Sequence, residues 1–365
     1  MRTSRNIKIN APGDVICIDE ALDTDLKEGE LLIRNEASLI SSGTELSRVY
    51  GLKKGVSYPV YPGYASIGRI ETVNFSQSAA ALRSAAKPAA APQPAAVSQP
   101  AAFAPGDRVL FSGPHQELQV YGIPAMTSLD MLVKLGPEYD FLSSADASLL
   151  HLGLVAMNGI LPADLKLGDK VCVFGLGVVG LLTALLYQAS GAEVLGIDAV
   201  ENRTVHAGQA GLRNALSAGG WQEQAGTVKE FFGREADIAV DATGRSEGII
   251  SAVMSCGDYG QVLLLGSPRI DHTCNITPVF NRIHMKMMTV TGAFNGRYPF
   301  YRKEGSRESI ERNMASFTAL IKTGLIEPLR IISHRVRPEA AMEAYDGLFH
   351  HPETYYCAVF DWTLT

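Results

Sequence analysis

The sequence is poor in cysteine, in excess basic charge and in long apolar runs, and each shortage excludes a class of protein. Its five cysteines are widely separated with no CxxC pair, so neither a disulfide framework nor a cysteine-rich zinc lobe is expected. A formal net charge of -6 gives no reason to expect nucleic acid or an anionic membrane as a partner. No segment approaches the ~18 apolar residues of a membrane span, and the first residues form no apolar signal segment. We therefore expect a soluble, cytoplasmic protein that binds a small molecule.

The 365 residues exceed the size of one typical domain, so two domains are expected. Residues 7–40 alternate apolar and polar side chains between turn residues, which predicts the short strands of a β-rich lobe. Residues 76–104 are dominated by alanine with scattered prolines, and this composition predicts a flexible surface insertion without chemistry. A strand is expected again at 105–111.

The centre of the chain alternates apolar strands with helices. Strands are predicted at 170–174, 193–197, 236–240 and 262–265, and a helix at 178–189. Buried strands that alternate with helices indicate an α/β fold with a doubly wound parallel sheet.

A glycine-rich turn directly follows the first of these strands and opens the helix. In a G-x-G-x-x-G turn the first glycine permits the tight bend, the second lets the backbone approach a pyrophosphate, and the third lets the helix pack on the strand. The motif alone is a weak signal, but here a strand, a helix and a second strand surround it as dinucleotide binding requires. The candidate cofactor-binding residues of the turn are Gly175, Gly177, Val178, Val179 and Gly180.

An acidic residue, Asp198, ends the second strand. A carboxylate there can accept both ribose hydroxyls of NAD and would repel the additional phosphate of NADP, so NAD is the predicted cofactor. Arg203, five residues further on, either contacts the adenosine side of the cofactor or is a solvated charge on the next helix.

The order of these motifs resembles the medium-chain dehydrogenase/reductase superfamily, which contains the alcohol, sorbitol and threonine dehydrogenase-like enzymes. The resemblance covers nearly the whole chain. It rests on the glycine turn and on S-G-T-E at 42–45, P-G-Y-A at 62–65, P-G-D-R-V at 105–109 and D-A-T-G at 241–244.

The resemblance implies a GroES-like β-rich catalytic domain built from both ends of the chain. This domain would comprise residues 1–147 and 297–365, around a Rossmann NAD-binding domain at 148–296. A helical stretch at 306–322 fits the return to the first lobe. A homodimer or homotetramer is the usual assembly of such enzymes. The resemblance adds three candidate cofactor contacts, which are Thr243, Gly266 and Ala293.

The sequence departs from its zinc-binding relatives at the catalytic metal site. Where those members carry cysteine, histidine and glutamate ligands, this chain has Ser42, Tyr64, Ala65 and His151. A zinc site requires three ligands drawn from thiolate, imidazole and carboxylate, and only His151 qualifies. A phenol with a pKa of ~10 also binds metal poorly at neutral pH. We therefore expect a zinc-free member, with no metal ligands.

Without zinc, another group must hydrogen-bond the substrate oxygen and move its proton. If the positions carry over, Tyr64 and His151 flank the former metal site, and either acts as general acid/base. Ser42 or Thr44 would orient this group or relay the proton. Imidazole ordinarily titrates near neutrality, which suits His151 to this role. The opposing interpretation is that Tyr64 and His151 only fill the volume of the missing metal. His115 is expected to be a solvated loop histidine.

Three functions remain open. The favoured one is an NAD-dependent, zinc-independent alcohol dehydrogenase-like oxidoreductase acting on a secondary alcohol or ketone, such as a polyol, a sugar or a natural-product intermediate. The second is a zinc-free enoyl or quinone reductase using NAD(P)H, which Asp198 disfavours. The third is a dinucleotide-binding protein without turnover.

Overall fold

The computed structural model describes residues 1–75, 96–97, 103–123, 130–294, 298–300 and 307–364. The insertion predicted at 76–104 lies almost entirely outside the described residues, so it stays a prediction. No described helix is long and apolar enough to cross a membrane.

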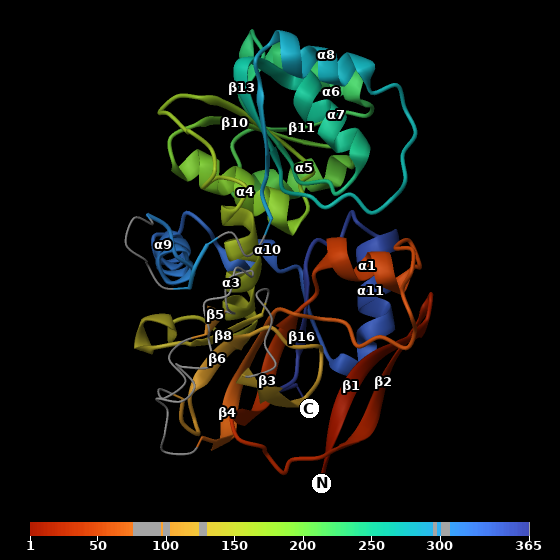
Figure 1. Cartoon of the computed structure of the whole chain (residues 1–365), viewed down its shortest axis with the longest axis vertical. Helices are drawn as coiled ribbons and strands as arrows, with labels where there is room; N and C mark the ends of the chain where they lie inside the picture. The colour runs from red at the N-terminus through yellow and green to blue at the C-terminus, as the bar shows by residue number, and fades with distance from the viewer. Residues whose placement is uncertain (76–95, 98–102, 124–129, 295–297, 301–306, 365) are drawn as a thin grey trace.

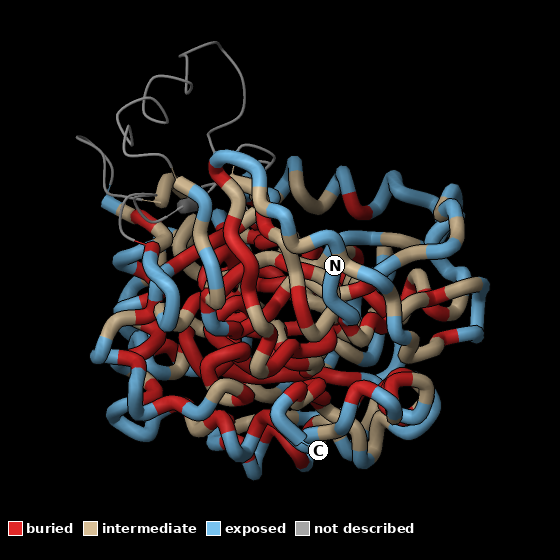
Figure 2. The backbone as a smooth tube through the Cα atoms, turned by 90° about the horizontal axis from the view of Figure 1, so that it is seen from below, coloured by how far each residue is buried: buried red, intermediate tan, exposed pale blue. Residues whose placement is uncertain are grey.

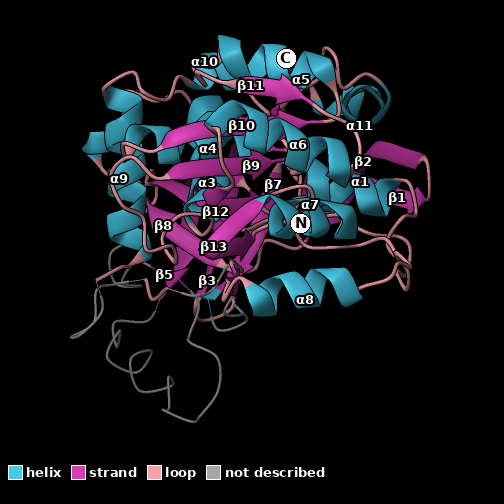
Figure 3. Cartoon of the chain, turned by 90° about the horizontal axis from the view of Figure 1, so that it is seen from above, coloured by secondary structure: helices cyan, strands magenta, loops and turns pink. Residues whose placement is uncertain are grey.

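Six parallel strands form the sheet of one lobe, in the order β11-β10-β9-β12-β13-β14 (Figures 1 and 3). The strands are β9 (Lys170–Phe174), β10 (Glu193–Asp198), β11 (Ala215–Ser217), β12 (Ala236–Asp241), β13 (Cys256–Leu264) and β14 (Thr289–Gly292). The helices that connect them are α4 (Val178–Ala189), α5 (Glu201–Gln209), α6 (Trp221–Phe232), α7 (Ser246–Ser255) and α8 (Thr277–Met285). The strand order reverses between β9 and β12, and ligands of such sheets bind at the carboxyl ends of the strands beside this point.

Alternation along each strand assigns its side chains to the two faces of the sheet. In β9, Val171 and Val173 share a core with α4, whereas Cys172 and Phe174 share the core that contains α6 and α7. Helices therefore cover both faces, which explains why these strands are apolar throughout.

A mixed, mainly antiparallel sheet forms the second lobe, in the order β15-β16-β3-β4-β6-β8-β5, with β7 also paired to β3. Its strands are β3 (Glu30–Leu39), β4 (Ser66–Asn74), β5 (Ala96–Val97), β6 (Arg108–Phe111), β7 (Leu118–Gly122), β8 (Met131–Lys134), β15 (His334–Val336) and β16 (Ala358–Asp361). A hairpin of β1 (Arg2–Ala11) and β2 (Asp14–Leu22) lies beside it. The last strand, β16, pairs with β3, so both chain ends belong to this lobe (Figure 1).

The remaining helices belong to the second lobe, and one of them, α3 (Ser144–Met157), contacts both sheets. They are α1 (Ser42–Val49), α3, α9 (Ile310–Lys322), α10 (Pro328–Ile331) and α11 (Ala341–His350), with the 3-10 turns η3 (Pro137–Tyr139) and η4 (Pro338–Ala340). The core around α3 includes Leu39 and Ile67 of one sheet and Val171 of the other. The most buried segments accordingly gather in the interior of the molecule (Figure 2).

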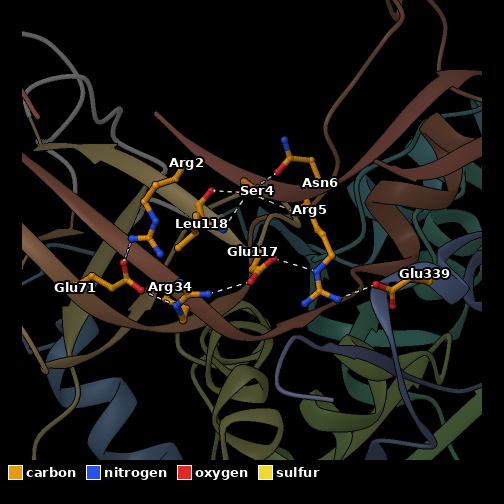
Figure 4. Close-up of polar contacts among 9 residues, drawn as sticks. All are labelled: Arg2, Ser4, Arg5, Asn6, Arg34, Glu71, Glu117, Leu118 and Glu339. Atoms are coloured by element: carbon orange, nitrogen blue, oxygen red, sulfur yellow. Dashed lines mark hydrogen bonds and ion pairs between the residues drawn. The ribbon is translucent and has the colours of Figure 1, made fainter. Parts of the chain in front are cut away.

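A ladder of alternating arginines and glutamates fastens the N-terminal hairpin to the sheet (Figure 4). Glu71 pairs with both Arg2 and Arg34, and Arg34 continues to Glu117 at 2.9 Å. Arg5 then bridges Glu117, at 3.0 Å, and Glu339 of η4, at 2.7 Å. These pairs are partly exposed, so each contributes little, on the order of 0.2–1 kcal/mol.

The predicted α/β architecture with a β-rich second lobe is confirmed. The strand at 170–174 and the helix at 178–189 coincide with β9 and α4. The strand predicted at 262–265 begins earlier in the structure, where β13 starts at Cys256. This strand passes through Tyr259, a non-glycine residue with φ 57°. The helix predicted from residue 306 begins at Ile310, since Ser309 caps it by accepting a hydrogen bond from Arg312 N.

Candidate active site

The glycine turn lies at the carboxyl end of β9, next to the switch point of the sheet. Gly175 has φ +88°, a conformation that favours glycine. A Cβ on Gly180 would lie 1.8 Å from the carbonyl oxygen of Gly175, so helix α4 can approach the turn only with glycine there. A Cβ on Gly177 would meet nothing within 4 Å, and Val178 and Val179 open α4 immediately after it. The turn therefore leaves room in front of the helix N-terminus, as a dinucleotide pyrophosphate requires.

Asp198, the last residue of β10, is 6% exposed, and its carboxylate is held by the backbone. Oδ2 accepts from Leu176 N at 2.7 Å and Oδ1 accepts from Val200 N at 2.9 Å. Each oxygen keeps a further lone pair for a ribose hydroxyl. Arg203 lies beside it, with Nη1 3.7 Å from Oδ2, so the structure places this arginine in an ion pair with Asp198.

The three remaining cofactor candidates lie at successive strand ends of the same sheet. Thr243 follows β12 and donates to Asp241 Oδ1 through both its backbone N and its hydroxyl. Gly266 follows β13, and a Cβ there would lie 2.3 Å from Gly244 N. Ala293 follows β14 and is 2% exposed. The structure thus brings all the predicted cofactor residues to one edge.

Sequence reasoning missed a small pocket beside this edge. Gly177 and Arg203 line it together with His206 and Tyr356, whose rings stack with centroids 3.6 Å apart. Burial lowers the pKa of His206 to about 4, so its ring is neutral at pH 7. No local motif marks Tyr356, because it lies far from the glycine turn in the sequence.

Tyr64 and His151 lie together, as the sequence predicts, in the second lobe. Their rings contact edge to face with centroids 5.1 Å apart. Tyr64 precedes β4, and its hydroxyl hydrogen-bonds Ser41 Oγ at the start of α1. Burial raises the pKa of Tyr64, and hydrogen bonds from the Ser41 and Thr44 side chains lower it in part. At neutral pH the phenol is therefore protonated and available as a hydrogen-bond donor.

His151 differs from the near-neutral titration expected of it. The residue is on α3 and is 3% exposed, and burial lowers its pKa to about 3. Its Nδ1 is buried without a hydrogen-bond partner among the described residues. A base with this pKa stays neutral at pH 7 and is a weak proton acceptor there. Between the two candidates, these properties favour Tyr64 as the acid/base.

Ser42 or Thr44 is the hydroxyl residue expected to orient the acid/base or relay its proton. No hydrogen bond between described residues involves the Ser42 side chain, whereas the neighbouring Ser41 contacts the phenol directly. Thr44 accepts from Arg269 Nη2 at 3.2 Å. Arg269 follows β13 in the other lobe, and sequence reasoning missed it because no motif marks this contact.

The expectation of a solvated His115 is wrong, because the structure buries it completely. Its Nε2 lies 2.9 Å from Glu45 Oε2 and its Nδ1 lies 2.8 Å from Ser38 Oγ. Glu45 is equally buried and also accepts from Tyr345 OH, at 2.6 Å, and from Ser41 N, at 2.7 Å. This network fixes the first turn of α1, and with it the serine that holds Tyr64.

The residues at the former metal positions do not fit zinc. Serine and tyrosine hydroxyls and the alanine methyl group offer no ligand that ionises readily, which leaves the His151 imidazole alone. Among the described residues, no group of three His, Cys, Asp or Glu side chains is placed to hold a metal ion.

Comparisons with known proteins support the superfamily that the motifs indicate. Residues 178–311 match the family model described as zinc-binding dehydrogenase. Sorbitol dehydrogenase 1 of Saccharomyces cerevisiae is 28% identical over 229 residues, which cover 61% of this chain and 58% of that protein. The chain thus spans less than two thirds of the length of this curated relative.

Solved structures match over almost the full length. Galactitol-1-phosphate dehydrogenase from Escherichia coli has a TM-score of 0.74 at 17% identity, covering 98% of this chain and 99% of that one. 2R,3R-butanediol dehydrogenase from Bacillus subtilis has a TM-score of 0.71 at 17% identity with the same coverage. These likenesses establish the fold: a Rossmann sheet with a GroES-like β-rich domain.

Proposed function

We propose that this chain is an oxidoreductase that transfers a hydride between NAD(H) and a secondary alcohol or its ketone, without catalytic zinc. One observation carries the proposal. A dinucleotide-type glycine turn and a hydroxyl cluster around Tyr64 belong to different lobes, yet Arg269 joins α1 of that cluster to the carboxyl edge of the sheet. This contact between the lobes supports the proposal that the two parts belong to one dehydrogenase site. The sorbitol and butanediol dehydrogenases among the relatives support an alcohol or polyol as substrate.

The residues of the site divide the chemistry between them. Bound NADH supplies the hydride for a ketone, and NAD accepts it from an alcohol. The protonated Tyr64 hydroxyl donates a hydrogen bond to the substrate oxygen and transfers its proton when a ketone is reduced. Ser41 and Thr44 hold the phenol, and the neutral His151 packs against its ring and excludes water.

NAD is the proposed cofactor because the Asp198 carboxylate ends β10 and keeps a lone pair on each oxygen for a ribose hydroxyl. Replacing Asp198 with asparagine should weaken NADH binding about 10-fold or more, because a ribose hydroxyl loses a charged acceptor. NADPH binding should weaken less or improve, since the repelling charge is gone. Fluorescence titration of the purified protein with both cofactors measures this, together with metal analysis of the same sample.

Glu201→Gln is the matched control, because Glu201 is an exposed carboxylate on the first turn of α5. It should bind NADH as the wild type does. If wild-type protein binds neither dinucleotide, the proposed function is wrong. Stoichiometric zinc in active protein would overturn the metal-free mechanism alone.

The enoyl or quinone reductase remains the alternative. It would add the hydride to a conjugated double bond and leave the carbonyl intact. Product analysis with an α,β-unsaturated ketone and NADH distinguishes the two reactions, since the proposed enzyme forms the allylic alcohol. A cytoplasmic location and the predicted domain boundaries (1–147, 148–296 and 297–365) belong to the same proposal.

We also propose a homodimer formed through the β14 edge of the parallel sheet. β14 is the last strand of that sheet, and exposed apolar side chains gather on it and beside it. They include Tyr259, Phe280, Met287 and Val290, which are between 39% and 71% exposed. A second copy related by a two-fold axis would pair the edge and cover these side chains.

Replacing Val290 with lysine should convert the dimer to a monomer, because it places a charge in the centre of this edge. Val205→Lys is the control, since Val205 is 53% exposed on α5, away from β14. Light scattering after size-exclusion chromatography measures the mass. Equal masses for wild type and both variants would reject this interface.

A further inference from the structure

Arg269 is the one described side chain that hydrogen-bonds the cluster around Tyr64 from the parallel sheet. Nη1 donates to Gly43 O at 2.6 Å and Nη2 donates to Thr44 Oγ1 at 3.2 Å. Glycines lie on both sides of the guanidinium, each close enough that a Cβ would be in van der Waals contact with it. A Cβ on Gly43 would lie 3.6 Å from Nη1, and a Cβ on Gly244, which follows β12, would lie 3.4 Å from it. The guanidinium therefore lies between the strand ends that would hold the cofactor and the first turn of α1.

The positive charge of Arg269 has no acidic partner among the described ion pairs. Burial lowers the pKa of this guanidinium, and the nearby charge of Arg48 lowers it further. A second contact joins the loop after α1 to the segment after β13. There Lys54 pairs with Asp271 on the surface, so this cation has an acidic partner. A partly buried cation without a counter-ion is costly unless negative charge develops next to it.

The group beside Arg269 that can carry such charge is Tyr64. Thr44 accepts from Arg269, and its side chain also lowers the pKa of the phenol, so it lies between the two groups. The charged and titratable groups around the phenol are few. Glu45 on α1 raises the pKa of Tyr64, Arg269 lowers it, and His151 on α3 is neutral at pH 7. Arg269 is thus the cation that counteracts the rise in the pKa of Tyr64 caused by burial and by Glu45.

We propose that Arg269 is a positioning residue that supplies the positive charge of the site through Thr44. The inference rests on the proposed function. Bound NADH would supply the hydride to the carbonyl carbon of a ketone. The Tyr64 O–H bond then breaks and the substrate oxygen gains the proton. The phenolate left behind accepts a hydrogen bond from Thr44, whose hydroxyl is polarised by Arg269. A proton from solvent then restores the phenol. Arg269 in this way carries out part of the electrostatic role that zinc has in metal-dependent relatives.

The test compares Arg269→Met and Arg269→Lys with the wild type. Arg269→Met should lower kcat about 30-fold, because the developing negative charge loses its cation. KM and the Kd for NADH should change less than about 3-fold. A general loss of structure would instead weaken the binding of substrate and NADH as well. Arg269→Lys should recover part of kcat. The part of the pH–rate profile that reports the ionisation of Tyr64 should move to higher pH in Arg269→Met.

Lys54→Met is the matched control, because it breaks the other contact between these segments and leaves Thr44 untouched. It should retain wild-type kcat and pH profile. A loss in Arg269→Met that falls entirely on the Kd for NADH would overturn the proposal, since Arg269 would then bind the cofactor phosphates. Equal kcat in all proteins would also overturn it.

A titration of tyrosinate absorbance separates this inference from the proposed function. The difference between wild type and Tyr64→Phe isolates the ionisation of Tyr64 without any substrate. This ionisation should move to higher pH in Arg269→Met, even if no alcohol or ketone is turned over. Coincident titrations would reject the role of Arg269 and leave the proposed function intact.

Discussion

Replacing Tyr64 with phenylalanine should lower kcat by about 10²- to 10⁴-fold, the contribution expected of one general acid. The substitution removes only the hydroxyl, which hydrogen-bonds Ser41, and keeps the ring that packs against His151. The fold and the cofactor site should therefore survive. Steady-state kinetics over a range of pH, with the Kd for NADH measured in parallel, records the effect. The Kd should stay within about 2-fold of the wild type, because Asp198 and the glycine turn lie in the other lobe.

Tyr61→Phe is the matched control for this variant. Tyr61 is three residues earlier and 37% exposed, and its hydroxyl bonds Glu20. It should keep full activity. A Tyr64→Phe enzyme that turns over at the wild-type rate would remove the phenol from the mechanism. The acid/base role would then pass to the other candidate, and His151→Asn would test it.

The sequence predicted best where local patterns are strong. The bounds of β9 and α4 were predicted correctly from a buried apolar run that ends at a glycine, because such a run and such a turn are local properties of the sequence. The contact of Ser41 with Tyr64 was not predicted, for a geometric reason. Neighbouring residues at the start of a helix point in different directions, so a shift of one position changes which hydroxyl reaches Tyr64.

Contacts between distant segments could not be read from the pattern. Arg269 contacts Thr44 across 225 positions of the sequence, and only the arrangement of the two lobes brings them together. His115 looks like a loop residue because its partners, Glu45 and Ser38, lie 70 or more positions away. A Gly-Pro-His segment gives no local sign of this burial.

The largest effect on stability should come from Glu45, the acidic residue of the S-G-T-E motif. Its carboxylate is fully buried and accepts three hydrogen bonds, from Ser41 N, His115 Nε2 and Tyr345 OH. Burial raises the pKa of Glu45, but the charge of His115 and these hydrogen bonds outweigh it and leave the pKa below its ordinary value. The folded protein therefore favours the ionised form, which links α1 to α11 and to the loop that precedes β7.

Replacing Glu45 with glutamine should lower the free energy of unfolding by about 3–5 kcal/mol, the usual cost of breaking a buried charge network. Glutamine has one acceptor oxygen, and its amide group opposes a donor that the carboxylate had accepted. Since a lowered folded pKa contributes its full stability above the unfolded value of 4.5, the difference from the wild type should be full at pH 7. It should shrink as the pH falls below 4.5 toward the folded pKa. Thermal and urea unfolding at several pH values measures this.

Two further variants make the Glu45 result decisive. Tyr345→Phe removes one donor from the network and should cost about 1 kcal/mol, so it folds even if Glu45→Gln does not. Glu343→Gln, at an exposed position on α11, should leave the unfolding midpoint unchanged. A Glu45→Gln protein as stable as the wild type at pH 7 would show that the network is not structural. Loss of kcat without loss of stability would instead assign Glu45 to the orientation of Ser41 and Tyr64, because Ser41 N is one of its three donors.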